Sequence, residues 1–430
     1  MKNESDLKET NLKKELAFKD VLSIGVGQTI GAGVMAMTGI AIGMTGTGAV
    51  LAYVISSILV ILISIPTMVM SSTLPTTGGS YKYSSRLLSP RAGLFYIFIY
   101  MAYNITLSLF AISFAEYMQA IVPAIPFKLA AGGLLTLFYI FNLTGIKSAA
   151  RLQNIMVIVM AISFALFIGY GMPEVDFSVY NAKEMMPSGF VGLLTVSGLL
   201  TFATGGANVV VNLGGEMKNP GRDIPLSMAI ATVLVGIIYA LMAFVASGVL
   251  PVEQVAYKNL TEVAQTILPG SLFTFFIVGG AMFAIATTLN STFSWVTKPI
   301  LSCCEDGWLP AKLGEVNKKF GTPHYLLTIF YIIGIIPVIT GISLTAVGTI
   351  GSGVALFMAL IPIIASFKLH KKYPEACKKA PFMLEPKLLR FTSIIAFILC
   401  LFQSVLLFST LSKSGIIMAI AYAIIAYIVA

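Results

Sequence analysis

The sequence predicts an all-α polytopic membrane protein, and two observations carry that prediction. Of its 430 residues, 57% are hydrophobic and only 10% are charged, whereas soluble domains carry roughly 25% charged residues. The apolar residues also fall into runs of about 20, the length that a helix needs to cross a bilayer. Backbone polar groups must be satisfied within the bilayer, and the alternation typical of a β-barrel is missing, so the crossings are expected to be helices.

Twelve apolar runs follow one another along the chain. They begin near residues 21, 48, 94, 127, 152, 189, 225, 270, 324, 343, 391 and 414. Because the gaps at 340–341 and 412–414 are short, a count of eleven stays open. Residues 1–20 are polar and lack the short apolar core of a removable signal peptide, so the first run is expected to be a retained crossing.

The basic residues predict how the chain lies in the membrane. Of 27 Lys and Arg, all but Lys128, Lys183, Lys258 and Lys413 fall in gaps on the side of the N-terminus. Since cytoplasmic loops are enriched in Lys and Arg, both termini are expected in the cytoplasm of a cell-membrane protein.

Three connections between the runs follow from this orientation. Residues 1–20 and 368–390 are expected to be cytoplasmic, and 173–188 extracellular. A second exterior connection, 251–268, has apolar positions at helical spacing. It predicts either a lid over an outward vestibule or a helix lying at the membrane interface.

The residue inventory argues against catalysis, metal binding and nucleic-acid binding. A membrane-embedded enzyme would need paired aspartates, a Ser/His pair or an HExxH helix, and the sequence has none of these. The net charge of +9 forms no basic stripe. The cysteines lack metal-ligand spacing, and the complete set of cysteines and histidines is Cys303, Cys304, Cys377, Cys400, His324 and His370.

Two runs contain glycine clusters that predict a break in the helix. The first reads GVGQTIGAG over 25–33, and the sixth reads FATGGAN over 202–208. Unwound backbone at membrane depth is tolerated only where protein encloses it or where it lines a cavity. Freed N–H groups attract an anion such as a carboxylate, and freed carbonyls attract a cation such as an ammonium.

These breaks also suggest an architecture. Two interrupted helices, each opening a half of five helices, indicate an inverted-repeat transporter with its site at the midplane of the membrane. Glycines elsewhere are expected only to let helices pack closely; these are Gly39, Gly43, Gly132 and Gly133.

Five motifs in order resemble those of one transporter family. They are GQTIGAGVM (27–35), PTTGGSYKY (75–83), NLTGIK (142–147) with LQN (152–154), GEMKNP (215–220) with Ile224 and Pro225, and DGWLP (306–310) with GTP (321–323). Together they resemble the amino acid–polyamine–organocation (APC) superfamily over most of the chain.

The resemblance implies a LeuT-type fold and an amino acid permease, a secondary active transporter. Two inverted five-helix repeats would span 21–172 and 189–367, and 391–430 would add two C-terminal helices. The first, second, sixth and seventh crossings would rock against the rest to give alternating access. Whether an accessory subunit is present stays open, because partner recognition leaves no readable motif in the sequence.

The resemblance also implies where the solute binds. In similar proteins the carboxylate of the solute meets N–H groups at the first break, and its amino group meets carbonyls of the sixth helix. The first set maps to Ile30, Gly31, Ala32, Gly33 and Val34, and the second to Phe202, Ala203 and Gly205.

Two departures from the family bear on the substrate. Ala207 stands where an aromatic residue often follows the glycine, and Asn208 stands where an acidic residue is common. Glu116 lies near the outer end of the third run, where an interfacial position is favoured over a functional one. With no acid in the pocket helices to meet a second positive charge, a neutral amino acid is favoured over a polyamine.

The coupling ion stays open. Met160 replaces a lysine that many proton-coupled relatives carry, whereas Thr287 and Thr288 are what a sodium site uses in similar proteins. Their hydroxyls, with carbonyls of Gly27 and Ile30, would form an oxygen cage suited to a hard cation. The alternative is that they only form hydrogen bonds to the backbone or to neighbouring helices. Sodium symport, proton-coupled transport, uniport and exchange of amino acids or related amines therefore all remain.

A last basic residue has two interpretations. Lys298 stands near the inner end of the eighth run, where the family often has arginine. It would close an inner gate by pairing with Glu216 or Asp223, or it would extend its ammonium to the lipid headgroups, which is the favoured interpretation.

Overall fold

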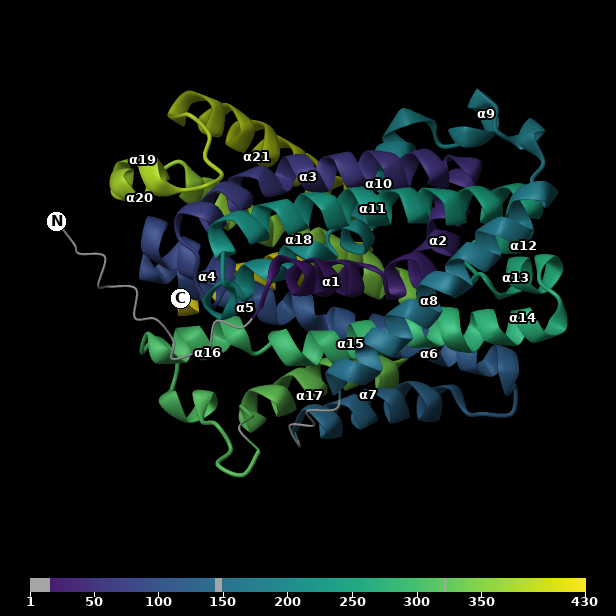
Figure 1. Cartoon of the computed structure of the whole chain (residues 1–430), viewed down its shortest axis with the longest axis horizontal. Coiled ribbons are helices and arrows are strands. Elements are labelled where there is room, and N and C mark those ends of the chain that lie inside the picture. Colours follow the sequence, from purple (N-terminus) through teal and green to yellow (C-terminus); the bar gives the residue numbers. More distant parts are fainter. Residues whose placement is uncertain (1–15, 144–148, 321) are drawn as a thin grey trace.

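The computed structural model describes residues 16–143, 149–320 and 322–430. Within these ranges the protein is all-helical, and its long helices run side by side along one axis (Figure 1). Most of the motif at 142–147, and Gly321, lie outside the described residues.

The helices follow the apolar runs. The longer ones are α1 (Phe18–Thr29), α2 (Ala32–Thr45), α3 (Ala49–Thr73), α5 (Pro90–Tyr103), α6 (Leu107–Ile121), α7 (Phe127–Leu143), α8 (Ala149–Gly171), α10 (Gly189–Thr204), α11 (Pro220–Val249), α15 (Phe283–Trp295), α17 (His324–Thr340), α18 (Leu344–Ser366), α21 (Pro386–Ser409) and α22 (Lys413–Val429). The shorter ones are α4 (Gly79–Tyr83), α9 (Ala182–Met185), α12 (Val252–Val255), α13 (Thr261–Ile267), α14 (Gly270–Phe275), α16 (Lys298–Glu305), α19 (Leu369–Lys372) and α20 (Pro374–Lys379).

The protein is a multi-pass membrane protein. Among the described residues, seven helices are long and apolar enough to cross a membrane, or eight if the bent pair 189–212 is one crossing. Three shorter apolar helices join them, at Phe127–Leu143, His324–Thr340 and Gly415–Val429. A helix lies at or within a few residues of each of the twelve predicted starts. The count of twelve crossings itself stays a prediction.

Packing concentrates on a few long helices. α3 packs most extensively against α11, and α18 packs against α21. Close approach is possible where side chains are small: a Cβ added at Gly236 of α11 would lie 2.1 Å from the Ser57 hydroxyl of α3. Large apolar side chains remain exposed on outer helices, such as Phe391, Ile398 and Ile428, as expected where lipid replaces water.

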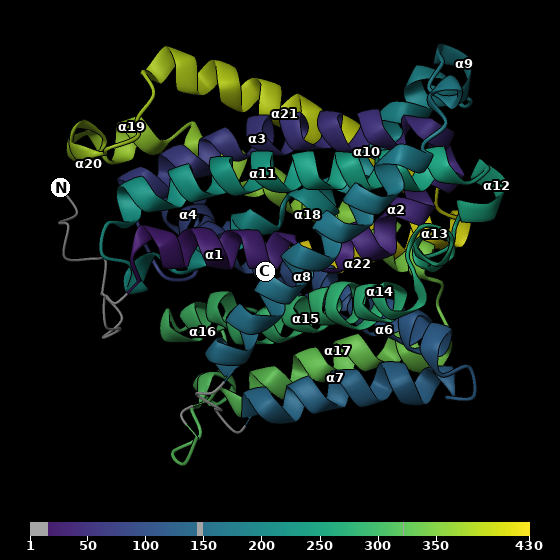
Figure 2. The same ribbon diagram turned by 45° about the vertical axis from the view of Figure 1, so that its right-hand side comes forward.

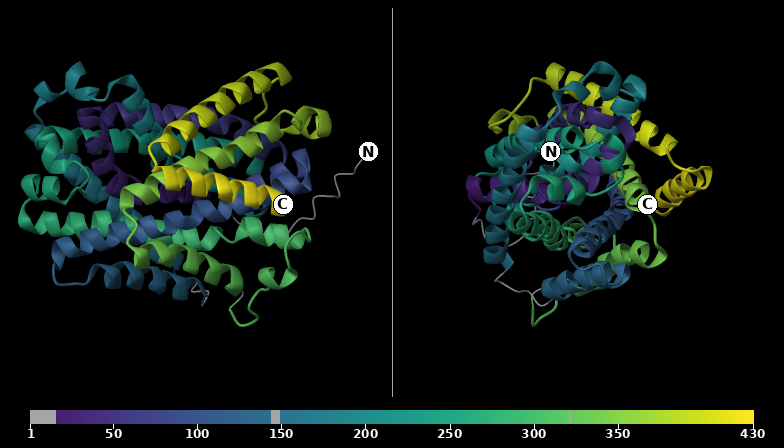
Figure 3. Two further views of the ribbon diagram at one scale, coloured as in Figure 1. Left: turned by 180° about the vertical axis from the view of Figure 1, so that it is seen from behind. Right: turned by 90° about the vertical axis from the view of Figure 1, so that its right-hand side faces the viewer.

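The two ends of the bundle differ in what they carry. One end holds α4, α16, α19 and α20, and the other holds α9, α12 and α13 (Figure 2). The C-terminal end of α22 lies at the same end of the molecule as α19 and α20 (Figure 3).

The connection over 251–268, called the lid below, packs against α2 and α6. Its Val255, Leu260 and Val263 are buried. Tyr257 N–H donates to the Gly39 carbonyl of α2 at 2.7 Å. Leu260 N–H donates to the Tyr117 hydroxyl of α6 at 3.1 Å.

The glycines expected to serve packing divide into two groups. A Cβ at Gly39 would lie 1.6 Å from the Lys258 carbonyl oxygen, and one at Gly43 would lie 2.6 Å from the Tyr257 ring, so both let the lid approach α2. At Gly132 the nearest atom, in Ile335, is 3.5 Å away, and at Gly133 nothing lies within 4 Å. The packing prediction is therefore wrong for Gly133, because no neighbour comes close enough to require a glycine.

Candidate functional site

The first predicted break is present. α1 ends at Thr29 and α2 begins at Ala32, with Ile30 in an extended conformation between them. A Cβ built on Gly31 would lie 1.5 Å from the Thr288 hydroxyl oxygen of α15. Glycine is needed there because the neighbouring helix comes so close.

The second predicted break is also present. α10 ends at Thr204, and the chain continues as a 3₁₀ helix, η7 (Gly206–Asn212), bent by 46° from α10. A Cβ on Gly206 would lie 2.6 Å from the Thr29 Cα. The two breaks therefore touch each other. The sequence analysis expected helix on both sides, and the second half is the tighter 3₁₀ form.

Two tyrosine hydroxyls form hydrogen bonds to backbone groups at the first break. The Tyr239 hydroxyl of α11 donates to the Thr29 carbonyl, which is freed where α1 ends. The same hydroxyl faces the N–H groups of Gly31 and Val34. The Tyr53 hydroxyl of α3 donates to the Gly33 carbonyl at 3.5 Å. Part of the break is thus already satisfied by side chains.

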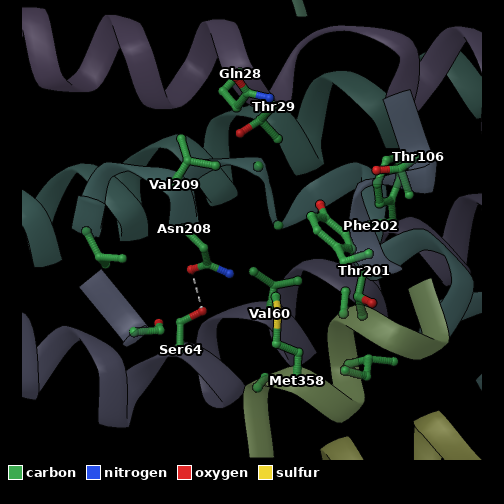
Figure 4. A pocket seen from close by; sticks show the side chains of 18 of the residues that line it. Gln28, Thr29, Val60, Ser64, Thr106, Thr201, Phe202, Asn208, Val209 and Met358 are labelled. Carbon is green, nitrogen blue, oxygen red and sulfur yellow. Dashed lines mark hydrogen bonds between the residues drawn. The ribbon is translucent and has the colours of Figure 1, made fainter. Parts of the chain in front are cut away.

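A cavity of about 190 Å³ lies beside the two breaks (Figure 4). Its lining includes these predicted site residues: Gly33, Phe202, Ala203, Gly205, Asn208 and Thr288. The remaining predicted residues do not line it: Gly27, Ile30, Gly31, Ala32, Val34, Ala207 and Thr287. The cavity thus lies against both breaks and touches the first through Gln28, Thr29 and Gly33.

The cavity wall is aromatic and apolar on one side. The Phe202 ring lies 6.2 Å from Phe110 and 6.4 Å from Tyr103, measured between centroids. Val60 of α3 and Met358 of α18 face the same space (Figure 4).

Uncharged polar groups form the rest of the wall. Ser64 donates to the Asn208 side-chain oxygen at 2.9 Å, and the Trp295 indole donates to the Gln28 side-chain oxygen at 2.9 Å. Gln28 in turn donates to Thr292 at 3.2 Å. Among the described lining residues there is no Asp, Glu, Lys, Arg or His.

The sequence of the chain decides its family. Residues 16–430 match the model of the amino acid permease family. The chain belongs to the amino acid permease family. Its members are transporters and not enzymes, in agreement with the sequence analysis.

Relatives of this permease carry several named substrates. The branched-chain amino acid permease BcaP of Bacillus subtilis is 25% identical over 85% of this chain and 83% of its own length. The methylthioribose transporter of the same organism is 25% identical over 87% and 86%. Cationic amino acid transporter 1 of Arabidopsis thaliana is 26% identical over 73% and 55%. These names describe the relatives and do not assign a substrate to this chain.

The threonines proposed for a cation are buried in the permease and bonded to their own helix. The hydroxyls of Thr287 and Thr288 donate to the Ala284 carbonyl at 2.9 and 3.0 Å. These bonds use their protons and leave oxygen lone pairs. Only Thr288 lies against the first break. Met160, at the position of the missing lysine, is fully buried. The Glu216 side chain, one proposed partner of Lys298, lies outside the described residues.

The sequence analysis missed residues that belong to other helices. Ser64, Tyr239 and Met358 reach the site from α3, α11 and α18. Their positions depend on how the helices pair, which a single sequence does not show. Gln28 and Trp295 had a weak signal, because polar or indole groups within apolar runs need a partner.

Proposed function

We propose that this permease carries neutral amino acids through the 190 Å³ cavity by alternating access. One observation carries the proposal: two helix breaks meet at a cavity whose described lining has no ionisable acid or base other than tyrosine. The charges of a zwitterion must then be met by backbone and hydroxyl groups. A cationic or anionic side chain would find no opposite charge there, and burying an unpaired charge is costly.

The size and wall of the cavity support a small solute with an apolar side chain. About 190 Å³ is below the roughly 300–1,000 Å³ of pockets for drug-sized ligands. Phe110, Phe202 and Met358 provide apolar contact on one side. Asn208 is one of the uncharged polar groups that line the same space (Figure 4).

The proposed contacts with the backbone divide between the two breaks. The solute carboxylate would meet N–H groups at the start of α2, sharing them with the Tyr239 hydroxyl. The ammonium would meet carbonyls at the end of α10, including those of Phe202 and Ala203. The predicted residues Ile30, Gly31, Ala32 and Val34 lie behind this surface, so they would act through backbone only.

The arrangement of the helices supports the LeuT-type repeat and the cytoplasmic termini. The two breaks occur in the first helix of each proposed half, 21–172 and 189–367. α22 ends at the same end of the molecule as α19 and α20, in the Lys-rich connection. The opposite end is closed by the lid, whereas the cavity lining extends to Ser80 of α4. This arrangement suits a state that is closed outside and faces the cytoplasm.

Sodium symport is the coupling that we propose to test first. The Thr288 hydroxyl lies against the first break and retains lone pairs for a hard cation. Exchange without a coupling ion is the competing possibility, because both threonines already bond to Ala284.

The test is uptake of radiolabelled amino acids into proteoliposomes under a sodium gradient, a proton gradient, or neither. We expect uptake of neutral amino acids that sodium accelerates, and loss of that acceleration on Thr288→Ala. Uptake that ignores both ions but rises with unlabelled amino acid inside would replace symport by exchange. Preferential uptake of lysine or arginine would refute the neutral substrate class.

A further inference from the structure

A second cavity, of about 610 Å³, lies at the end of the molecule that carries α19 and α20. It is formed by three segments that are distant in the chain: the end of α3, the start of α11 and residues 376–381. It shares no lining residue with the 190 Å³ cavity. The proposed transport cycle does not require a ligand there.

Its charge is one-sided. Lys218, Arg222 and Lys379 line it, and no Asp or Glu does so among the described lining residues. Two carboxylates flank the lining without belonging to it. Asp223 is 3% exposed and interacts with the charge of Arg222. Glu375 pairs with Lys378 at 2.8 Å and also interacts with the charge of Lys379. All three basic side chains are exposed, so solvent screens their mutual repulsion, and an anion placed between them would be attracted by each.

The start of α11 also lies at the cavity, with Asp223 as the acidic residue of its first turn. α11 is 30 residues long and begins at the cavity wall, and its first residue, Pro220, has no N–H. Asn219 precedes it and makes no side-chain capping bond. The start of a long helix carries a partial positive charge and favours anions, phosphate groups in particular.

The cavity is preformed by fixed contacts. Phe382 N–H donates to the Ser72 hydroxyl at 2.9 Å, which holds the segment after α20 against the end of α3. A Cβ on Gly221 would lie 3.2 Å from Pro381, so the start of α11 packs against the same segment. These contacts keep Lys379 opposite Lys218 and Arg222 without a ligand.

We propose that this cavity binds a phosphate-bearing anion, either the headgroup of an anionic lipid or a soluble phosphate. Arginine and lysine together with a helix start form the usual set of partners for phosphate oxygens. If this end faces the cytoplasm, it lies beside the leaflet that carries anionic lipids. The bound anion joins α3 and α11 to the connection between α18 and α21.

The test measures thermal unfolding of the full chain, purified in a neutral detergent. One arm adds pyrophosphate, with sodium chloride at equal ionic strength as its reference. The other adds phosphatidylglycerol, with phosphatidylcholine as its reference. The cavity variant is Lys218→Gln/Arg222→Gln/Lys379→Gln. The control variant, Lys318→Gln/Lys371→Gln/Lys387→Gln, removes three exposed charges outside the cavity lining.

We expect the anion to raise the unfolding midpoint of the wild type and the control, and the cavity variant to lose most of that rise. A response to phosphatidylglycerol alone would identify a lipid headgroup, and a response to pyrophosphate a soluble ligand.

Two results would overturn the proposal. An equal rise in all three proteins would mean general screening of surface charge, and no rise in the wild type would mean no site. The readout is unfolding and not uptake, so failure of the transport proposal would leave this result interpretable.

Discussion

Gly31 is the residue with the least space around it in the site. We predict that Gly31→Ala abolishes uptake, because the new Cβ would lie 1.5 Å from the Thr288 hydroxyl oxygen and would force α2 and α15 apart. Gly133→Ala is the matched control, since nothing lies within 4 Å of its Cβ position. Uptake should be compared at equal amounts of protein in the membrane. Normal uptake by Gly31→Ala would show that the break tolerates a side chain and would refute its proposed role.

Asn208 is an uncharged residue of the cavity wall that a single substitution would make acidic. We predict that Asn208→Asp lets lysine or arginine compete with neutral amino acids, because the new carboxylate keeps the Ser64 hydrogen bond and offers a partner for a cationic side chain. Competition of radiolabelled neutral uptake by lysine measures this. Ser64→Ala is the control, since it removes the hydrogen bond without adding charge and should leave lysine ineffective. Equal competition by lysine in wild type and variant would place Asn208 away from the solute side chain.

For individual residues, the sequence predicted the glycine clusters at the two breaks. It did not predict the side chains of other helices that contact those breaks. The clusters at 25–33 and 202–208 were sufficient to place both breaks, because dense glycine at membrane depth has few structural explanations. Tyr239 could not be found in the same way. Its role comes from the register of α11 against α1, and nothing in its local sequence distinguishes it from other buried tyrosines.

The lid contacts α2, the helix that begins at the first break. Tyr117 of α6 joins it to α2, because its hydroxyl donates to the Met35 carbonyl at 3.0 Å and accepts from Leu260 N–H at 3.1 Å. We predict that Tyr117→Phe opens the outer side more often. A buried N–H left without a partner costs about 1–3 kcal/mol, which corresponds to a change in population of about 5- to 140-fold.

A cysteine replacing Thr106 in the cavity wall would report this opening through its rate of labelling by an impermeant thiol reagent added outside. Tyr139→Phe is the control, because that hydroxyl bonds Thr328 between α7 and α17, away from the lid. If both variants label at the wild-type rate, the lid is not held by Tyr117.

Among the structural elements, the sequence predicted where helices start but not the lid or the π-helical turn. Helix starts followed from apolar runs, because lipid allows few alternatives. The lid could not be distinguished from an interfacial helix, since both need the same amphipathic spacing. The sequence did not predict the π-helical turn at Phe276–Met282, between α14 and α15. Its Gly279 and Gly280 lie close to Val159 and Ser163 of α8, and that proximity depends on tertiary packing.

Across the whole molecule, one acidic residue connects two of the family motifs. Asp306 accepts from the Tyr81 hydroxyl at 2.8 Å and from Lys82 at 2.6 Å. The Lys82 and Asp306 side chains are 14% and 17% exposed. We predict that Asp306→Asn lowers the free energy of unfolding by about 1–3 kcal/mol, because a largely buried ammonium loses its charged partner.

The unfolding midpoint checks this prediction. Glu375→Gln is the control, since its pair with Lys378 has side chains that are 68% and 71% exposed and is screened by solvent. Equal effects of the two substitutions would mean that the Asp306 contacts contribute no more than a surface pair.

The overall architecture was the most predictable level. Composition and the length of the apolar runs fixed an all-helical membrane protein, and the motif order pointed to the permease family before any geometry was known. The number of crossings was harder. α2 and α3 form one uninterrupted apolar stretch, Met37–Thr73, because the turn between them, Gly46–Gly48, is itself helical.

The position of Trp295 in the wall of the solute cavity has a practical consequence. The chain contains only two tryptophans. Trp295 is 6% exposed in the cavity wall, and Trp308 is 48% exposed in a connection. A Trp308→Phe protein would keep a single indole fluorophore, positioned at the solute cavity. Its emission would then act as an unlabelled optical sensor of occupancy, able to detect inhibitors that bind without being carried.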